Sequence, residues 1–551
     1  MSSLRSRSVS CPAELIAENV ASHRTCAARL TRRFLFRRGD SLAHYEMMGV
    51  MEPANASSLL NSLRLGSPVA EHDAALASYF IETDTFTQLV EDRGDVIAGD
   101  KGTGKTALFT ILKGRYSDDP RLVDVEVLSA FNPAGTPIFE RLLEKGELSE
   151  AQYIAVWKTY AVSLAGNWLL DYYGSARPGR MGELEEILQR SGLRVKEATP
   201  QNAFVKLIAY LRPSTVENTT TFTQEGIPIF ASKFAWESPQ PPADEPVQFL
   251  RHDDALELLE ECLSEASATV WLTFDRLDEA FQAHPSVEKP ALRGLFRAYL
   301  DLGALSHLRL KLFVRRDLFA RIVEGGFVNL THVNARRITI TWEDDDLYNL
   351  LFRRLVESEG FQQATGFSKD SPPDQVFAFV FPEKVDAGAR KPPTWKWILT
   401  RIRDGNGVKS PRNLVDLVSR AVEAQKRREA QNPRRLDASG PLITADALKH
   451  AQTELSKDRV EDTLLAEAGD STAAIKAFAN GKAEHNVDSL RVLFGDQADE
   501  IRERLITLGF LEASGRTWKV PPLYRPGLSI SQGKAFSTTG ESLDEDVEDD
   551  E

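Results

Sequence analysis

The chain has 551 residues, a formal net charge of −14 and a pI near 5.4. At ~100–200 residues per domain this length predicts roughly three domains. The hydrophobic share of 42% and the charged share of 27% are ordinary for a globular protein. The acidic balance argues against a protein whose main task is to coat DNA, because phosphate binding needs a basic face. Part of the negative charge lies in the last residues, and we expect residues 536–551 to form a solvated, disordered acidic tail.

Cysteine usage and hydropathy narrow the cellular context. The three cysteines, Cys11, Cys26 and Cys262, show no paired spacing, which indicates a reducing compartment without disulfides or a structural zinc site. No run of ~18 or more apolar residues is present, so no membrane span is expected. We therefore expect a cytoplasmic protein with no membrane partner.

The first residues differ in composition from the rest, since they are rich in Arg and Ser and carry two of the cysteines. A transit peptide has a similar composition but tends to avoid acids such as Glu14. We expect residues 1–55 to be a poorly structured extension, with Met47, Met48 or Met51 as alternative first residues. A genuine functional arm is the other interpretation.

The predicted elements alternate between helices and strands after this extension. Helices are predicted at residues 71–90, 107–113, 137–173, 253–266 and 289–302. Strands are predicted at residues 95–98, 122–129, 269–274, 308–314 and 333–340. Residues 177–246 carry Pro and Thr clusters and are interpreted as an insert beside the core. Alternation of this kind predicts an α/β fold with a parallel sheet.

A glycine-rich loop joins the first strand to its helix. Its residues match G-x-x-x-x-G-K-[ST] and are followed by an alanine: Gly99, Asp100, Lys101, Gly102, Thr103, Gly104, Lys105, Thr106 and Ala107. Glycines let the backbone wrap closely around a phosphate, while inward amides and the positive end of the helix bind it. Lys105 is expected to reach the β- and γ-phosphates, and the Thr106 hydroxyl to bind Mg²⁺. The sequence therefore predicts a P-loop that binds ATP and Mg²⁺.

Acidic residues follow the apolar strand at residues 269–274. Asp275 ends this strand, and we expect it to hold the magnesium ion together with Thr106. Asp278 and Glu279 are candidates to orient or deprotonate the attacking water. Their alternative role is simply to begin a helix, whose N-terminus favours negative charge. We favour catalysis because this strand is expected to lie beside the P-loop strand.

The loop GDKGTGKTA and the acid cluster DRLDE together resemble the STAND and NACHT-like branch of the AAA+-related ATPases. That branch has a small residue after the metal-binding Asp, where this chain has Arg276. The motifs YF (79–80), FVRRDLF (313–319) and LYRPGL (523–528) are also similar to a bacterial P-loop ATPase family, over roughly residues 71–533. The resemblance implies an ATPase that acts as a switch or motor on a partner protein or nucleic acid, in phage defence or DNA transactions, with homo-oligomers as one option.

The resemblance also implies two arginines that sense the nucleotide. Arg315 follows the strand at residues 308–314, where this class places a residue that senses the γ-phosphate. Its alternative is a neighbouring salt bridge between Arg316 and Asp317. Arg412 opens a helix after Pro411, which fits a first helical turn, and in the lid of such proteins it reaches back to the nucleotide. Its alternative is a surface arginine.

Residues beyond the sheet complete the predicted architecture. Helices are expected at residues 343–359, 395–403 and 411–428, and a helix followed by a hairpin near Ser514 and Gly515 has the outline of a winged helix. We predict an α/β P-loop NTPase sheet with helices on both faces, a helical lid and a small C-terminal winged-helix-like unit. The predicted boundaries are an extension at 1–55, a core at 56–342 with a helical insert at about 137–260, a lid at 343–455, a winged-helix-like domain at 456–535 and a tail at 536–551.

Competing functions are weighed by the motifs that they require. A GTPase is disfavoured because no NKxD run is present, and a transporter ATPase because no LSGGQ-like signature is present. A nucleotide kinase is usually much smaller. A regulatory or scaffold protein that holds ATP without hydrolysis stays open. In the last unit, basic residues are interleaved with Glu503 and Glu512, so a structural or protein-docking role is favoured over DNA binding.

Overall fold

The computed structural model describes residues 55–131, 148–174, 178–195, 216–222, 228–234, 251–277, 279, 285–435, 440–466 and 468–536. The expectations for the N-terminal extension and the acidic tail fall almost wholly outside these residues, as do parts of the insert and the first part of the helix predicted at 137–173. Cys262 is buried and forms no disulfide. No helix among the described residues is both long and apolar enough to cross a membrane.

Five parallel strands form the central sheet, in the order β2–β5–β6–β1–β7. Their bounds are β1 (Val96–Gly99), β2 (Val125–Phe131), β5 (Thr269–Phe274), β6 (Leu308–Arg315) and β7 (Arg337–Thr339). The predicted strands are all present, although helix α11 (Leu330–Ala335) occupies part of the range expected for the last one. One expectation is wrong: β5 does not lie beside the P-loop strand, because β6 pairs with both β1 and β5.

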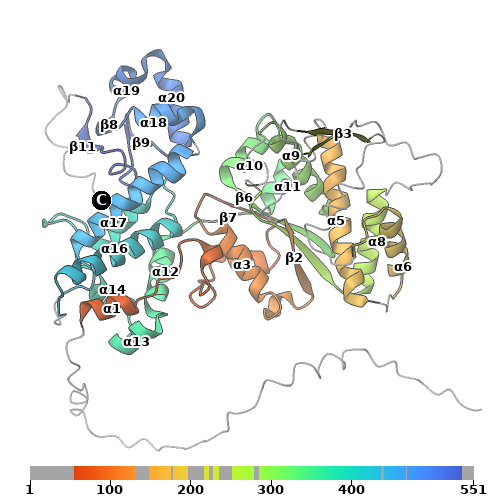
Figure 1. Ribbon diagram of the computed structural model, residues 1–551, viewed down its shortest axis with the longest axis horizontal. Coiled ribbons are helices and arrows are strands. Elements are labelled where there is room, and N and C mark those ends of the chain that lie inside the picture. Colours follow the sequence, from red (N-terminus) through yellow and green to blue (C-terminus); the bar gives the residue numbers. More distant parts are fainter. Residues whose placement is uncertain are drawn as a thin grey trace, which may run out of the picture. The chain divides into compact units, whose positions relative to one another are not determined.

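Helices cover both faces of this sheet, as predicted (Figure 1). Side chains alternate between the faces of a strand. Accordingly, Val96 and Ala98 of β1 belong to one hydrophobic cluster and Ile97 to another. The first face is covered by α5 (Glu150–Tyr173), α6 (Met181–Arg190), α8 (His252–Glu265), α9 (Pro285–Leu302) and α10 (Arg316–Val323). The second face is covered by α2 (Asp84–Val90) and α3 (Lys105–Arg115).

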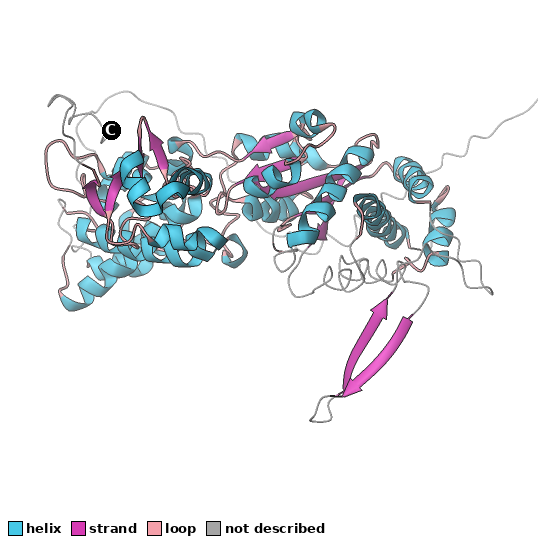
Figure 2. Ribbon diagram, turned by 90° about the horizontal axis from the view of Figure 1, so that it is seen from above, coloured by secondary structure: helices cyan, strands magenta, loops and turns pink. Residues whose placement is uncertain are grey.

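The insert is not helical throughout. Its strands β3 (Val216–Phe222) and β4 (Pro228–Phe234) pair antiparallel and form a two-stranded sheet of their own (Figure 2). Helix α5 begins at a capping box in which Ser149 and Gln152 satisfy each other's backbone N–H groups. The insert therefore contributes helices to the first face of the main sheet. It also contributes a separate hairpin.

The segment before the P-loop strand contains one of the one or two helices expected at residues 71–90, but most of this range is not helical. Only the 3₁₀ turn η3 (Ala70–His72) and helix α2 are regular there. Further upstream, α1 (Ala56–Ser62) buries its apolar residues in the cluster of the lid helices and not in the sheet core. The bridge between Asn55 and Arg435 also ties this start to the lid. Residues 56–62 therefore pack against the lid helices, although they precede the sheet in the sequence.

The lid consists of helices that share one hydrophobic cluster with α1. Their bounds are α12 (Asp344–Val356), α13 (Glu359–Thr365), α14 (Pro373–Val380), α15 (Thr394–Ile402), α16 (Pro411–Gln431) and α17 (Ala445–Asp458). The π-helix η5 (Arg459–Leu465) follows α17. Elsewhere, short 3₁₀ turns are η4 (Pro120–Leu122), before β2, and η6 (Gly469–Ser471) and η7 (Gly495–Gln497), in the C-terminal unit. The cluster continues into the C-terminal unit, so that unit does not have a core separate from the lid.

The C-terminal unit contains a helix followed by a hairpin, as the sequence predicted. It contains α18 (Thr472–Lys476), β8 (Lys482–His485), α19 (Val487–Phe494), α20 (Ala498–Thr507), β9 (Glu512–Ser514), β10 (Thr517–Lys519) and β11 (Ser531–Lys534). β9 and β10 form the expected antiparallel hairpin, and β10 pairs with β8. Gly515 at the hairpin turn has a φ of +57°, a conformation that favours glycine. Strands β8 and β11, which pair in parallel, are additions to the predicted outline.

Candidate nucleotide-binding site

The glycine-rich loop lies at the carboxyl end of β1 and begins α3. Gly102 and Gly104 have φ angles of +79° and +103°, which L side chains rarely adopt. The Thr103 hydroxyl donates to the Asp100 carbonyl at 2.8 Å. The Lys105 ammonium donates to the carbonyl oxygens of Gly99 at 2.8 Å and of Asp100 at 3.0 Å. The loop is therefore a closed turn with its lysine held over it, the form expected of a phosphate cradle.

The absence of side chains at two loop glycines allows close packing. A Cβ on Gly99 would lie 2.6 Å from the Thr103 Oγ1. A Cβ on Gly102 would lie 2.5 Å from the Ser410 Oγ and 3.1 Å from the Arg412 Cβ. The distances of 2.6 Å and 2.5 Å are shorter than real Cβ contacts allow. The first glycine thus lets the loop fold on itself, and the second lets the lid approach it.

Asp275 faces Thr106 across the site, as the sequence predicted. Its side chain is 4% exposed and hydrogen-bonds the Thr106 hydroxyl and the Arg276 backbone N–H. Burial raises the pKa of Asp275 to about 6, although these hydrogen bonds and the charges of Arg276 and Lys105 oppose the rise. The carboxyl ends of parallel strands share one edge of a sheet, so Asp275 reaches the loop even though β6 intervenes.

Glu279 returns toward the site through a tight turn after Asp275. Arg276 has a φ of +56°, and its carbonyl accepts the backbone N–H of Glu279 at 3.0 Å. The two side chains form an ion pair at 3.6 Å, and both line the cavity. Asp278, the other predicted catalytic acid, lies outside the described residues.

The adjacent arginines at the end of β6 and the start of α10 have different partners from those expected. The Arg315 guanidinium donates to both carboxylate oxygens of Asp317, each at 3.0 Å. Burial works to raise the pKa of Asp317, but this arginine outweighs it and holds that pKa below its usual range. Arg316, expected as the alternative partner of Asp317, instead lies 3.4 Å from the P-loop carboxylate of Asp100. Arg315 nevertheless lines the same cavity as the P-loop.

Three groups at the lid contact P-loop carbonyls. Ser410 occupies the N-cap position of α16, yet its hydroxyl donates to the Gly102 carbonyl at 3.0 Å. The backbone N–H of Arg412 points to the same carbonyl at 3.5 Å. The indole N–H of Trp342, which precedes α12, donates to the Thr103 carbonyl at 2.8 Å. The lid and the loop are thus joined by hydrogen bonds.

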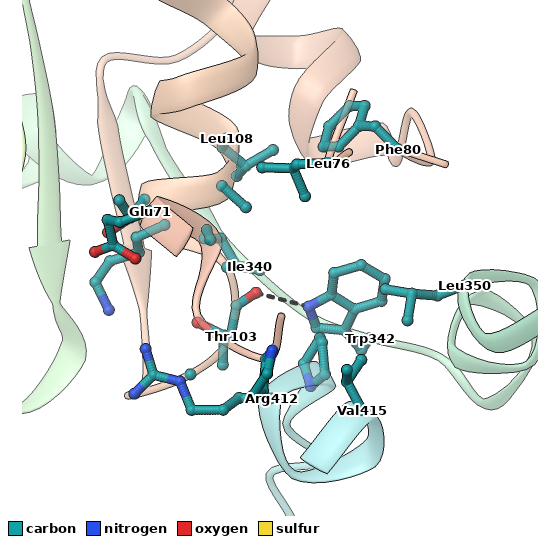
Figure 3. A pocket seen from close by; sticks show the side chains of 18 of the residues that line it. Glu71, Leu76, Phe80, Thr103, Leu108, Ile340, Trp342, Leu350, Arg412 and Val415 are labelled. Carbon is teal, nitrogen blue, oxygen red and sulfur yellow. Dashed lines mark hydrogen bonds between the residues drawn. The ribbon is translucent and has the colours of Figure 1, made fainter. Parts of the chain in front are cut away.

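The Arg412 side chain points into the cavity (Figure 3). Its Nε is buried without a hydrogen-bond partner among the described residues. Burial and then the nearby charge of Arg459 lower the pKa of Arg412, and the carboxylates of Glu71 and Asp416 oppose that change. A buried guanidinium nitrogen without a partner is costly. An anion bound in the cavity would satisfy it.

The cavity between these groups has a volume of about 210 Å³. One side carries the charged and phosphate-loop residues. The other side is apolar and is formed by Leu76, Phe80, Leu108, Ile340, Trp342, Leu350 and Val415 (Figure 3). Sequence reasoning missed this apolar wall, apart from the aromatic pair at residues 79–80 that entered through a resemblance. A cavity with a polar end and an apolar end suits a nucleotide, whose phosphates and base differ in the same way.

The residues present fit Mg²⁺ and a nucleoside triphosphate. No group of three or more His, Cys, Asp or Glu side chains is placed to hold a metal within the described residues. Magnesium in such sites keeps several waters and takes only one or two protein ligands besides phosphates. Thr106 and Asp275, already in contact, match that requirement.

The fold and this loop define the class: a P-loop NTPase-type α/β domain followed by a helical lid. No protein-family model matches the chain, and no curated protein matches it.

Solved structures show only distant likeness. The chain is similar to the ORC2 protein of Aeropyrum pernix in ADPNP–ADP complexes, at 13% identity over 86% of this chain and 96% of that chain, with a TM-score of 0.32. It is similar to the ORC1 protein of Aeropyrum pernix in complex with DNA, at 14% identity over 84% and 96%, with a TM-score of 0.34. It is also similar to the Walker-type ATPase paby2304 of Pyrococcus abyssi, at 12% identity over 82% and 96%, with a TM-score of 0.37. This likeness is too distant to transfer an activity to the chain.

Proposed function

We propose that this protein binds ATP with Mg²⁺ and hydrolyses it, and that the lid transmits the state of the site to a partner. The observation that carries the proposal is the contact between Thr106 and Asp275 beside the glycine loop. It joins a hydroxyl and a buried carboxylate, the two protein groups that a magnesium–nucleotide complex requires, at the mouth of the cavity.

The described residues divide the work. The backbone amides of the loop and the Lys105 ammonium bind phosphate oxygens. Thr106 and Asp275 hold the magnesium ion, which when bound would neutralise charge on the phosphates. Glu279, or Asp278 beside it, orients or deprotonates the attacking water. Arg315 and Arg412 act as the two nucleotide sensors.

The lid contacts explain how hydrolysis could act as a switch or motor. Ser410, Arg412 and Trp342 contact the outer carbonyls of the loop that would hold the phosphates. A change in the loop is therefore transmitted to α12 and α16 through short bonds. The STAND or NACHT-like assignment and a homo-oligomeric state belong to this proposal and rest on the resemblance of the sequence motifs. A cytoplasmic location also belongs to it and rests on the cysteine usage and the lack of a long apolar run.

The partner that the C-terminal unit suits best is a protein. On α20, Arg502 forms ion pairs with Asp499 at 2.5 Å and Glu503 at 2.8 Å, and Arg504 pairs with Glu500. These arginines are neutralised by acids on their own helix. A helix of this kind lacks the basic face that backbone phosphates require. Nucleic acid remains the second candidate partner.

The proposal is tested with Lys105→Ala, using Lys113→Ala at the exposed end of the same helix as the control. Charge-assisted hydrogen bonds contribute about 1.5–3 kcal/mol each, so ATP affinity should fall by one to two orders of magnitude in the first variant only. Isothermal titration calorimetry with Mg²⁺ and ATP measures the change. Equal affinity in the two variants would exclude the loop as the nucleotide site.

Phosphate release separates the proposed ATPase from the alternative of a non-hydrolysing ATP-binding regulator or scaffold. Pure protein with Mg²⁺ and ATP should release phosphate at a rate that Lys105→Ala abolishes. Tight binding without release would favour the regulator or scaffold.

A further inference from the structure

Glu71 is a carboxylate in the cavity that belongs to none of the motifs. It lies in the 3₁₀ turn η3, in the irregular segment before the P-loop strand, and its side chain is 29% exposed. It lines the same cavity as Lys105, Asp275 and Arg412. Figure 3 shows the Glu71 carboxylate and the Arg412 guanidinium on the same side of the pocket, with the rings of Trp342 and Phe80 on the other side. Glu71 is therefore at the phosphate end.

The direct partner of Glu71 is Arg276. The Arg276 guanidinium donates a hydrogen bond to the Glu71 carboxylate and lies 3.6 Å from Glu279. Arg276 follows Asp275 immediately and has a positive φ, which is uncommon for a residue other than glycine. One guanidinium is thus shared by Glu71 and Glu279, and it stands next to the carboxylate that faces Thr106.

A second arginine is close enough to respond to Glu71. The Glu71 charge works against the lowering of the pKa of Arg412, which burial and Arg459 cause. Two cationic side chains from different elements, one after β5 and one on α16, therefore lie around a single carboxylate. Arg412 also retains a buried Nε without a hydrogen-bond partner in the described part of the chain.

A carboxylate among phosphate-binding cations has a definite electrostatic effect. It neutralises part of the positive charge that would attract a phosphate, and it repels the phosphate as a like charge. The effect is largest for the phosphate that comes nearest to Arg276. Under the proposed function this is the terminal phosphate of a triphosphate, because Asp275 and Glu279 stand at the magnesium and water end of the site.

We propose that Glu71 is a specificity-determining residue, which competes with the terminal phosphate of a nucleoside triphosphate for Arg276. Its presence lowers the affinity for the triphosphate relative to the diphosphate. This inference rests on the proposed function, since it assumes that the cavity binds a nucleotide. It assigns to the segment before the P-loop a part in discriminating between the two nucleotides.

The test is Glu71→Gln in the full chain, titrated by calorimetry with Mg²⁺ and either ADP or a non-hydrolysable ATP analogue. Removal of one like charge from a partly exposed site should tighten analogue binding by about three- to thirtyfold. Binding of ADP should change by less than about threefold, because its phosphates are held by the loop amides. Glu82→Gln is the matched control, since Glu82 lies on the same segment but pairs with Arg115 and Arg121 away from the cavity.

The outcomes separate this inference from the proposed function. No Lys105-dependent nucleotide binding in the unmodified chain would refute the function itself. Normal binding with an unchanged ratio of ATP-analogue to ADP affinity in Glu71→Gln would overturn the inference alone. Weaker analogue binding would also overturn it, because Glu71 would then be holding Arg276 in place for the phosphate. Glu71→Ala, which also removes the charge, should reproduce the shift and serves if the Gln variant folds poorly.

Discussion

The two edges of the central sheet treat buried charge in opposite ways. At the amino edge, the fully buried Lys311 ammonium lies 2.5 Å from Asp92 Oδ1 and 2.8 Å from Asp95 Oδ1, and it donates to the Gly94 carbonyl at 3.0 Å. Arg336 also pairs with both aspartates. At the carboxyl edge, Arg412 Nε is buried without a hydrogen-bond partner among the described residues, and the Arg412 side chain lines a cavity.

The two edges distinguish buried charges that stabilise the fold from charged groups that are available to a ligand. Charges buried on folding require partners, and at the amino edge the chain supplies them from the residues just before β1, from β6 and from the residue before β7. At the carboxyl edge the chain brings cations together and leaves the Arg412 Nε without a hydrogen-bond partner among the described residues. Strand β1 has only four residues, so these paired charges at its amino end lie close to the loop at its carboxyl end. The unpaired Arg412 Nε belongs to a side chain that lines the cavity, so a bound anion would supply its missing partner.

The largest effect is expected at the carboxyl edge of the sheet, on the rate of ATP hydrolysis. Glu279→Gln keeps the shape and hydrogen-bonding capacity of the side chain but removes the base. ATP binding should be nearly unchanged, while hydrolysis should slow by roughly 10²–10⁴-fold, the usual loss on removing a general base. Single-turnover hydrolysis measures the rate, and calorimetry measures binding.

Asp278→Asn is the matched comparison for that experiment. If only this variant loses turnover, the base is Asp278 and Glu279 is its neighbour. If neither variant slows hydrolysis, the acid cluster is structural. The acids at the carboxyl edge would then have the same role as those at the amino edge.

The next effect concerns the amino edge. Lys311→Met should destabilise the fold by about 3–5 kcal/mol, because it removes one of the two cations that pair with the buried carboxylate of Asp95. Lys105→Ala, at the other edge, should change stability far less. Urea unfolding followed by circular dichroism compares the two variants. A loss below about 1 kcal/mol for Lys311→Met would show that the saturated cluster is not structural.

Local motifs explain why so much of the site was predictable. The loop from Gly99 to Thr106 is a continuous run whose glycines and lysine have meaning only in one turn, and the structure has that turn. Strand β5 is a short apolar run that ends in an acid, so Asp275 was found at the strand end. Sequence-adjacent features of this kind depend on backbone geometry that the residues themselves dictate.

Features set by distant contacts were missed. The position of β6 between β1 and β5 depends on chain crossings that no local pattern encodes. The exchange of partners between Arg315 and Arg316 depends on where Asp100 lies after folding. The lysine inside the apolar run LRLKLFV did carry a signal. A lysine in a strand with both faces covered is buried only if it has charged or polar partners. The sequence of the strand does not identify those partners.

The smallest effect is expected at the amino edge, in the dependence of the unfolding free energy on pH. Burial works to raise the pKa of Asp95, but Arg336 and Lys311 outweigh it and hold that pKa below its usual range. Tyr299, which donates to Asp95 at 3.2 Å, also faces the carboxylate, and Asp92 shares its cations. The folded state therefore binds fewer protons than the unfolded state just below the ordinary pKa of about 3.9.

The sign of the pH dependence follows from this difference in bound protons. The stabilisation from Asp95 is fully present above a pH of about 3.9 and is lost as the pH falls through the lower folded pKa. Asp95→Asn removes it, so the slope of unfolding free energy against pH in that acidic window should decrease by up to about 1.4 kcal/mol per pH unit. Urea titrations at a series of acidic pH values measure both slopes. Equal slopes for the variant and the unmodified chain would mean that Arg336 and Lys311 do not favour the ionised form of Asp95. The charges at the amino edge would then not stabilise the folded state in the way described.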